Sequence, residues 1–303
     1  MAQFDNPVGG TELMYNELMS RVDKKLLNNV SIFNYLSKAN FNKKTVYWNQ
    51  LSYDQEAVNF LNDLGFVERI NHFVFVSYWQ AEVYKKFFKI PDSKINVIKN
   101  ACIGVEPKLP RNNNKIKVCY TSTPWRGLDI LLDSWAKLNP NDAELHIFSG
   151  TKIYGNEFYK SQDEAHRYLY DKCKEIPNVT YRDNIPNEDL RKELPSFDIL
   201  AYPSTFEETS CISVIEAISA GLRVVCSSLG ALPETTEGWA RMYPGIQERN
   251  HHISTFADIL GQEIEAVRDG VYDEQIKLQT EIYAPAWSWD ERIYDWEDFL
   301  SSI

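Results

Sequence analysis

Residues 201–221 read AYPSTFEETSCISVIEAISAG, an apolar strand followed by a short polar segment and then by a helix that Gly221 ends. In an open α/β sheet, ligands bind beyond the carboxyl ends of the strands, often at helix N-termini whose free amides attract phosphate. The side chains at the helix start, Thr209, Ser210 and Cys211, are small enough to leave those amides accessible to a diphosphate. This stretch therefore predicts a phosphate-binding turn in an α/β domain.

The chain on both sides of this stretch alternates between helical and strand patterns. Strands such as ILAY at 199–202 are apolar on both faces, which is typical of parallel strands covered by helices on each side. The alternation includes a helix predicted over 55–64, stops at a Pro-, Gly- and Asn-rich linker over 103–114, and restarts at residue 116. We therefore predict an α/β protein with two doubly wound, Rossmann-like domains.

The last large apolar residues of the chain lie on one helical face. Trp289, Ile293, Trp296 and Leu300 are spaced by four, three and four residues. An aromatic stripe of this width has to be buried. It packs either back across the domain junction or onto the second domain, and the pattern alone leaves both possibilities open.

The composition is that of an ordinary globular protein, with 303 residues, 44% hydrophobic and 25% charged. No apolar run approaches the roughly 18 residues that a membrane span needs, and residues 1–5 lack the features of a signal peptide, so we expect a cytoplasmic protein. The net charge of −11 argues against nucleic-acid binding. Up to residue 115 there are 15 Lys and Arg against 11 Asp and Glu, and beyond it 17 against 32. This asymmetry suggests domains with different partners, although solvated charge explains it more simply.

Several common sites are disfavoured by what the sequence lacks. The five scattered cysteines form no Cys-x-x-Cys pair and are interpreted as buried, reduced thiols. There is no Asp-x-Asp and no His pair with helical spacing, so no essential metal is expected. No GxGxxG occurs, and although Gly150 and Gly155 have Walker spacing, Asn156-Glu157 stands where Lys-Ser/Thr is required. A nicotinamide-dependent enzyme and an ATPase are therefore both disfavoured.

Two glutamates, Glu208 and Glu216, stand around the helix start. Glu216 lies among apolar residues, where a carboxylate is costly unless it is paired, either with a sugar hydroxyl or with a basic residue from elsewhere in the chain. Helical rise places Glu216 roughly 9 Å along the axis from the first turn, whereas Glu208 precedes that turn. The two carboxylates therefore look like separate hydroxyl-binding groups rather than a hydrolytic pair about 5 Å apart.

The segment that contains these two glutamates resembles a motif of a known family. The segment from Glu208 to Ala217, preceded by Tyr202-Pro203-Ser204 and followed by Gly221 and Gly230-Ala231-Leu232-Pro233-Glu234, resembles the Glu-x7-Glu region of glycosyltransferase family 4. Further similar segments occur in the family's order: Gly9-Gly10-Thr11-Glu12, Val76-Ser77 to Ile98-Lys99-Asn100, Arg126-Gly127-Leu128-Asp129, and 287–300. The resemblance implies the GT-B fold. Its expected parts are an abbreviated acceptor-side domain (1–112), a nucleotide-sugar-binding domain (113–286) and a closing helix (287–303) that packs back on the first domain.

The resemblance also implies a function, a retaining glycosyltransferase that moves a sugar from a nucleoside-diphosphate sugar to an acceptor hydroxyl without a metal. Glu216 would bind the ribose and Glu208 the transferred sugar, and Arg126 would neutralise the leaving group. The amides of Ser210, Cys211 and Ile212 would bind the diphosphate. The other donor-binding residues would be Thr209 at the helix start and Gly9 and Gly10 of the glycine loop. Removing one such donor to phosphate typically slows an enzyme by about 10²-fold or more.

Three departures from the family pattern affect the expected activity. Only eight residues precede Gly9, so the first domain is expected to be abbreviated. Asn49 stands where many members have a histidine, and it cannot act as a base; a mechanism in which the leaving phosphate takes the acceptor proton would tolerate this. A second basic residue upstream of Arg126 is missing, because Ser122 and Thr123 occupy that place, and Lys152 is the candidate substitute.

The acceptor and the alternatives stay open from sequence. The acceptor is a carbohydrate, a lipid-linked molecule or a protein, and the oligomeric state is undetermined. Residues 84–89 interleave aromatic residues with lysines, which fits either weak peripheral membrane contact or, more simply, a solvated lysine face over buried aromatic residues. Two alternatives to the transferase are a nucleotide-sugar-binding module without transfer activity and a sugar-nucleotide epimerase of the same fold.

Overall fold

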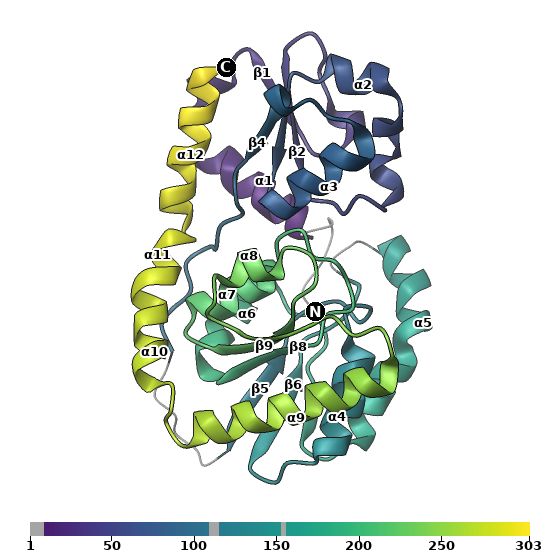
Figure 1. The fold of residues 1–303 in the computed structure, drawn as a ribbon, viewed down its shortest axis with the longest axis vertical. Helices are drawn as coiled ribbons and strands as arrows, with labels where there is room; N and C mark the ends of the chain where they lie inside the picture. The colour runs from purple at the N-terminus through teal and green to yellow at the C-terminus, as the bar shows by residue number, and fades with distance from the viewer. Residues whose placement is uncertain (1–8, 109–114, 153–155) are drawn as a thin grey trace.

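The computed structural model describes residues 9–108, 115–152 and 156–303. Figure 1 shows two α/β lobes, the first domain above and the second below, with C-terminal helices running along one side of both. The predicted boundary between residues 112 and 113 and the residues before Gly9 lie outside the described ranges.

The first domain contains a four-stranded parallel sheet in the order β1-β2-β3-β4. Its elements are α1 (Gly10–Arg21), β1 (Val30–Phe33), β2 (Lys44–Asn49), α2 (Leu64–Arg69), β3 (His72–Phe75), α3 (Tyr78–Phe88) and β4 (Ile95–Val97), with 3-10 turns at Lys24–Leu27, Leu36–Lys38, Glu56–Asn62 and Asp92–Lys94. The helix predicted over 55–64 is instead a 3-10 segment followed by α2. Asp63 separates the two, because its extended backbone ends the first segment and its side chain accepts a hydrogen bond from the amide of Gly65.

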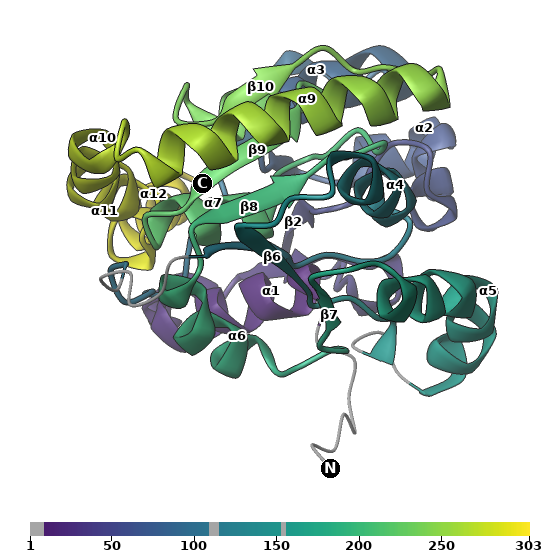
Figure 2. The ribbon, with the colours of Figure 1, turned by 90° about the horizontal axis from the view of Figure 1, so that it is seen from below.

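The second domain contains a six-stranded parallel sheet in the order β10-β9-β8-β5-β6-β7. Its strands are β5 (Ile116–Tyr120), β6 (Ala143–Ile147), β7 (Val179–Tyr181), β8 (Ile199–Tyr202), β9 (Arg223–Ser227) and β10 (Arg241–Tyr243). Its helices are α4 (Leu128–Leu138), α5 (Asn156–Glu175), α6 (Asn187–Glu193), α7 (Ile212–Ser219), α8 (Leu232–Thr236) and α9 (Arg249–Arg268). Figure 2 shows α9 lying alongside α4. The prediction of two Rossmann-like domains is confirmed.

The strand order of the second sheet determines where a ligand can bind. From β5 the chain proceeds outward to β6 and β7, then returns to place β8 on the other side of β5. Such a reversal opens a crevice at the carboxyl ends of the two adjacent strands. The loops that leave β5 and β8 carry Arg126 and Glu208, so the topology brings these distant residues to one edge of the sheet.

The chain ends with α10 (Asp273–Leu278), a π-helical turn (Gln279–Tyr283), α11 (Ala284–Ala286) and α12 (Trp289–Ser302). Helix α12 returns to the first domain (Figure 1), where the Trp296 ring packs edge-on against Trp48 of β2 with 4.8 Å between ring centroids. Trp289 and Leu300 are buried in the same cluster. The amide of Cys102 donates to the carbonyl of Trp287 over 2.7 Å, which joins the connecting segment to this return. Of the two open possibilities for the aromatic stripe, the structure has the one that crosses the domain junction.

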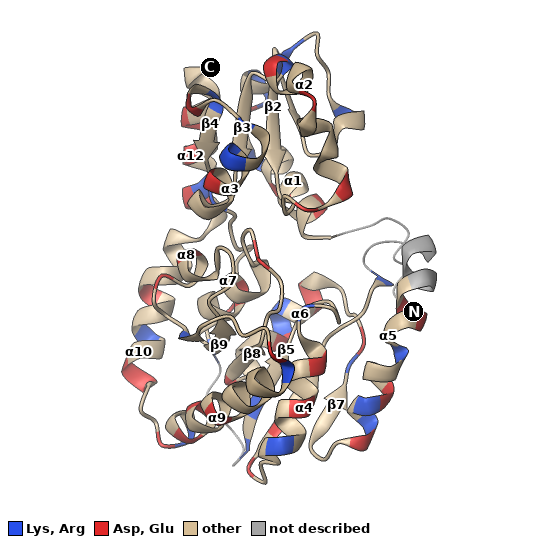
Figure 3. Cartoon of the chain, turned by 45° about the vertical axis from the view of Figure 1, so that its right-hand side comes forward, with Lys and Arg blue, Asp and Glu red and all other residues tan. Residues whose placement is uncertain are grey.

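The cysteines, the distribution of charge and the character of the helices bear on the expectations from sequence. All five cysteines are buried and unpaired, as predicted. Figure 3 shows that both domains have basic and acidic residues on the face in view. None of the helices in the described ranges combines the length and apolar character that a bilayer crossing needs.

Candidate active site

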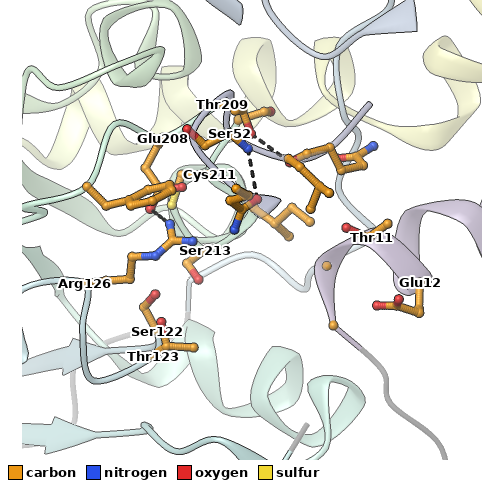
Figure 4. A pocket seen from close by; sticks show the side chains of 18 of the residues that line it. Thr11, Glu12, Ser52, Ser122, Thr123, Arg126, Glu208, Thr209, Cys211 and Ser213 are labelled. Atoms are coloured by element: carbon orange, nitrogen blue, oxygen red, sulfur yellow. Dashed lines mark hydrogen bonds and ion pairs between the residues drawn. The ribbon is translucent and has the colours of Figure 1, made fainter. Parts of the chain in front are cut away.

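A pocket of about 510 Å³ lies between the two domains. The first domain contributes the glycine loop, the start of α1 and the loop after β2; the second contributes the loops after β5 and β8 and the start of α7. Figure 4 shows side chains from both domains converging on this space. Thr209 joins the two walls, because its hydroxyl donates to the carbonyl of Gln50 over 3.1 Å.

The N-terminus of α7 points a set of donors into this pocket. Its N-cap residue, Cys211, provides no side-chain hydrogen bond to the first amides of the helix, and both Ile212 and Ser213 line the pocket. The hydroxyls of Ser210 and Thr123, two more lining residues, are buried and have no hydrogen-bond partner among the described residues. Buried hydroxyls are normally satisfied, so these two groups are available to bond a polar ligand in the pocket.

Cys211 itself is unsuited to act as a nucleophile. Its thiol is buried beside the carboxylate of Glu208, and both the burial and the neighbouring negative charge raise the pKa of the thiol well above its usual range. The thiol therefore stays protonated at neutral pH. The contribution of this residue to the pocket is a small side chain and a backbone position.

Arg126 and Glu208 form an ion pair in the wall of the pocket (Figure 4). The hydroxyl of Tyr202 also donates to Oε1 of Glu208 over 2.6 Å. The guanidinium carbon of Arg126 lies 3.8 Å from the ring centroid of Phe206, a distance typical of a cation–π contact. Glu208 is only 6% exposed, so this carboxylate depends on its two partners for its charge to be tolerated.

Two glycines permit this arrangement. Gly127 follows Arg126 with a φ of 95°, and a Cβ there would lie 2.1 Å from the carbonyl oxygen of Pro203. Gly230 has a φ of 60°, and a Cβ there would lie 2.5 Å from the carbonyl oxygen of Glu208. That same oxygen accepts a hydrogen bond of 2.7 Å from the amide of Ala231. The motifs around residues 126 and 230 therefore fix the backbones of the two charged residues.

Glu216 has a different position from the one that its expected role suggests. It is 3% exposed and does not belong to the lining of the pocket. Asn187 of α6 donates to its Oε1 over 3.2 Å, and the Arg191 guanidinium lies 4.0 Å away. Of the two partners that the sequence left open, a sugar hydroxyl or a basic residue, the structure has a basic residue beside Glu216. Burial outweighs these partners and raises the pKa of Glu216 to about 7.

Two other residues singled out from sequence also lie apart from the lining. Lys152 forms an ion pair with Asp183, beyond the end of β7. Asn49 is fully buried inside the first domain, where its Oδ1 accepts hydrogen bonds from the Tyr47 hydroxyl and the Leu51 amide. Asn49 thus positions the loop after β2 and does not face the pocket, whereas Gly9 and Gly10 do line it. A Cβ on Gly10 would lie 3.0 Å from Ile212, so the glycine loop directly faces the start of α7.

Sequence reasoning missed several residues that shape the site. Glu12, held by a 3.1 Å hydrogen bond from Tyr35, lines the first-domain wall. Glu234 of the second domain accepts hydrogen bonds from the amides of Tyr78 and Trp79, over 3.0 and 3.2 Å, and so caps α3 of the first domain. Glu234 lies in a motif that the sequence showed, but no local pattern indicates that its partner is a helix 155 residues away.

The stretch over 84–89 serves the core. Tyr84 and Phe88 are buried in the first domain, and Lys85 pairs with Asp92. Of the three aromatic residues only Phe87 is exposed, so the helix lacks the apolar face that binding to a membrane surface requires. In the described part of the chain no three His, Cys, Asp or Glu residues gather as metal ligands.

The chain is similar to known proteins in part of its sequence and in its fold. Residues 115–260 match the family model of glycosyl transferases group 1, whereas no curated protein matches the chain. Among solved structures, HepE from Anabaena in complex with UDP and glucose has a TM-score of 0.72 at 16% identity, covering 100% of this chain and 84% of that one. A glycosyltransferase from Rickettsia africae has a TM-score of 0.69 at 13% identity, covering 100% and 83%.

A third similar structure is sucrose-phosphate synthase from Thermosynechococcus elongatus, with a TM-score of 0.66 at 15% identity, covering 90% of this chain and 73% of that one. Likenesses at these identities concern the fold, whereas the family model concerns the sequence of the second domain. The chain therefore has the GT-B fold, and residues 115–260 are similar in sequence to the group 1 glycosyl transferases.

Proposed function

We propose that this protein is a retaining, family 4 glycosyltransferase that moves a sugar from a nucleoside-diphosphate sugar to an acceptor hydroxyl. The observation that carries the proposal is the start of α7. Its uncapped amides, the unpartnered hydroxyls of Ser210 and Thr123, and the guanidinium of Arg126 all border one pocket between the domains. This is a set of donors suited to a diphosphate.

The expected chemistry follows from that set of donors. The bond between the anomeric carbon and the diphosphate oxygen breaks, and its electron pair goes to the leaving phosphate. The acceptor oxygen bonds to the same carbon on the same face and gives its proton to the departing phosphate oxygen. Amides and Arg126 stabilise the charge that develops on the phosphate. No enzymic base is required, which is compatible with Asn49 lying inside the first domain.

Glu208 would accept hydrogen bonds from hydroxyls of the transferred sugar. It is already bonded to Arg126 and Tyr202 at the wall of the pocket, so its position is fixed before the donor arrives. Arg126 contacts this carboxylate and also lines the pocket. When the donor binds, Arg126 would therefore bind the leaving phosphate while Glu208 binds the sugar hydroxyls. This is preorganisation of the kind that accelerates charge-forming steps.

The nucleoside would extend from the start of α7 toward α6. Glu216 would then bind the ribose, which requires Asn187 or Arg191 to yield part of the present contacts. On this path the base would approach Lys152 and Asp183, which form an ion pair beyond the end of β7. We propose UDP-sugars as the first donors to test, because the Anabaena HepE structure similar to this chain contains UDP and glucose. Metal independence and a cytoplasmic location belong to the same proposal.

The test is a donor panel. The protein is incubated with UDP-, GDP- and ADP-sugars, with and without candidate acceptors and with and without a chelator, and nucleotide release is measured. Acceptor-dependent release that survives the chelator, with an NMR-assigned product of unchanged anomeric configuration, is the expected result. Binding without release would identify a nucleotide-sugar-binding module instead, and conversion of the donor without acceptor would identify an epimerase.

A further inference from the structure

A pair of stacked aromatic rings stands at the surface of the first domain. The rings of Tyr53, in the loop after β2, and Phe87, in the last turn of α3, are 4.5 Å apart between centroids and inclined by 27°. Phe87 is 60% exposed, in contrast to its helix neighbours Tyr84 and Phe88, which are in the core. The core therefore does not account for this ring.

The stacked pair lies at the rim of the pocket. Tyr53 follows Ser52 and lies two residues before Gln55, both of which line the pocket, and its hydroxyl donates to Oε2 of Glu207 over 3.3 Å. Glu207 is itself flanked by the lining residues Phe206 and Glu208. Side chains of both domains thus meet just outside the lining, next to Glu208. Figure 1 shows α3 on the side of the first domain that faces the second.

The charges around the rings restrict what can bind there. The two charged groups that raise the pKa of Tyr53 are the carboxylates of Glu207 and, less strongly, Asp54. These two carboxylates would repel an anionic ligand at the Tyr53 ring, whereas Lys86 and Lys89 lie near Phe87 in the sequence. A neutral sugar ring meets the same surface favourably, because its C–H face fits the electron-rich face of an aromatic ring and its hydroxyls can donate to carboxylates.

We propose that Tyr53, Phe87 and Glu207 form an acceptor subsite for a neutral sugar ring. The inference rests on the proposed glycosyl transfer and narrows it, because the acceptor is then a saccharide rather than a lipid phosphate. The subsite would adjoin the pocket of the donor sugar, because Ser52, Phe206 and Glu208, the sequence neighbours of Tyr53 and Glu207, line that pocket. An acceptor ring stacked at the rim would have a hydroxyl directed inward toward the donor.

The test compares two exposed aromatic residues of the same helix. Phe87→Ala removes the ring that α3 contributes to the stack, and Tyr78→Ala removes a 66% exposed ring at the other end of α3. Acceptor kinetics are measured with the active donor and with maltose, cellobiose, lactose or undecaprenyl phosphate in detergent. A neutral disaccharide should be the acceptor, and Phe87→Ala should raise its KM by about 3- to 10-fold, more than the donor KM. Phe87→Trp should restore it, and Tyr78→Ala should leave it unchanged.

Two results would overturn the subsite while the transferase proposal stands: equal acceptor KM values in the two alanine variants, or transfer to undecaprenyl phosphate and to none of the disaccharides. If no donor is turned over, the transferase proposal fails instead. Saturation-transfer NMR of the disaccharides then decides separately on the subsite. Binding to the unmodified protein that Phe87→Ala abolishes supports it, and absence of binding to the unmodified protein contradicts it.

Discussion

The two walls of the interdomain pocket differ in how their side chains are held. On the second domain, Arg126 and Glu208 are locked by charge, by the Tyr202 hydroxyl and by glycines that admit a close backbone. Among its described residues, the wall of the first domain consists of a glycine loop and uncharged residues around Gln50, with one carboxylate, Glu12, which is held by a single tyrosine. The difference suggests that the donor side is built for fixed electrostatics and the acceptor side for adaptable contacts.

The largest effect that tests this difference is expected from Arg126→Ala. The variant removes the charge proposed to stabilise the leaving phosphate and leaves Glu208 buried with only Tyr202 as a partner. We expect kcat to fall by about 10²- to 10³-fold. Arg249→Ala, which removes an arginine paired with Asp133 on the surface, is the matched control and should leave kcat unchanged. A kcat within threefold of the original enzyme would remove Arg126 from the proposed mechanism.

The next effect concerns the backbone under Glu208. Gly230→Ala would place a methyl group 2.5 Å from the Glu208 carbonyl oxygen, so this backbone would have to move. We expect kcat to fall by up to about 10²-fold, the typical consequence of a displacement of about 1 Å at a catalytic group. Gly238→Ala is the control, since Gly238 also has a positive φ but a Cβ there meets nothing within 4 Å. It should cost only about 1–2 kcal/mol of stability. Equal kcat values in both variants would contradict the positioning argument.

Glu216 gives a pH-dependent prediction. Its pKa rises from 4.5 to about 7 on folding, so between these values the folded protein keeps a proton that the unfolded chain has lost. The free energy of unfolding should therefore fall as pH rises through this window and level off above pH 7, by at most about 3 kcal/mol. Glu216→Gln should lose this dependence and be more stable than the unmodified protein at pH 8, as measured by urea unfolding at pH 5 and 8.

The same variant tests the ribose role. If Glu216 binds the nucleoside, Glu216→Gln should weaken donor binding at pH 8 even as the fold becomes more stable, because a buried carboxylate kept for function costs stability. Isothermal titration with the active nucleotide sugar measures this. An unchanged dissociation constant together with increased stability would show that Glu216 serves neither the ribose nor the fold, and the proposed path of the nucleoside along α6 would be abandoned.

The sequence could predict features of the site that lie within one contiguous segment, but not those that depend on distant segments. The turn into α7 was predictable because strand, small residues and helix are contiguous between 199 and 219. The role of Gly127 was not, because the carbonyl oxygen that a Cβ there would meet belongs to Pro203, far away in the sequence. The burial of Asn49 was not predictable, because its match to a family position at the end of β2 does not tell which side of a short sheet faces a second domain. The position of Glu216 was hidden because its partners come from another helix, α6, and burial by a distant element leaves no local pattern.

The smallest expected effect concerns a contact between the two domains that lies outside the lining of the pocket. Glu234 accepts from the amides of Tyr78 and Trp79, and such a cap contributes about 1 kcal/mol. Glu234→Ala should speed hydrogen exchange at these two amides and loosen the domains, increasing the radius of gyration measured by small-angle scattering without donor. Glu237→Ala, which removes only the partner of Lys99 in a more exposed ion pair, should change neither quantity. Exchange that is equally slow in both variants would mean that α12 and the other contacts between the domains hold the first domain in place without the Glu234 carboxylate.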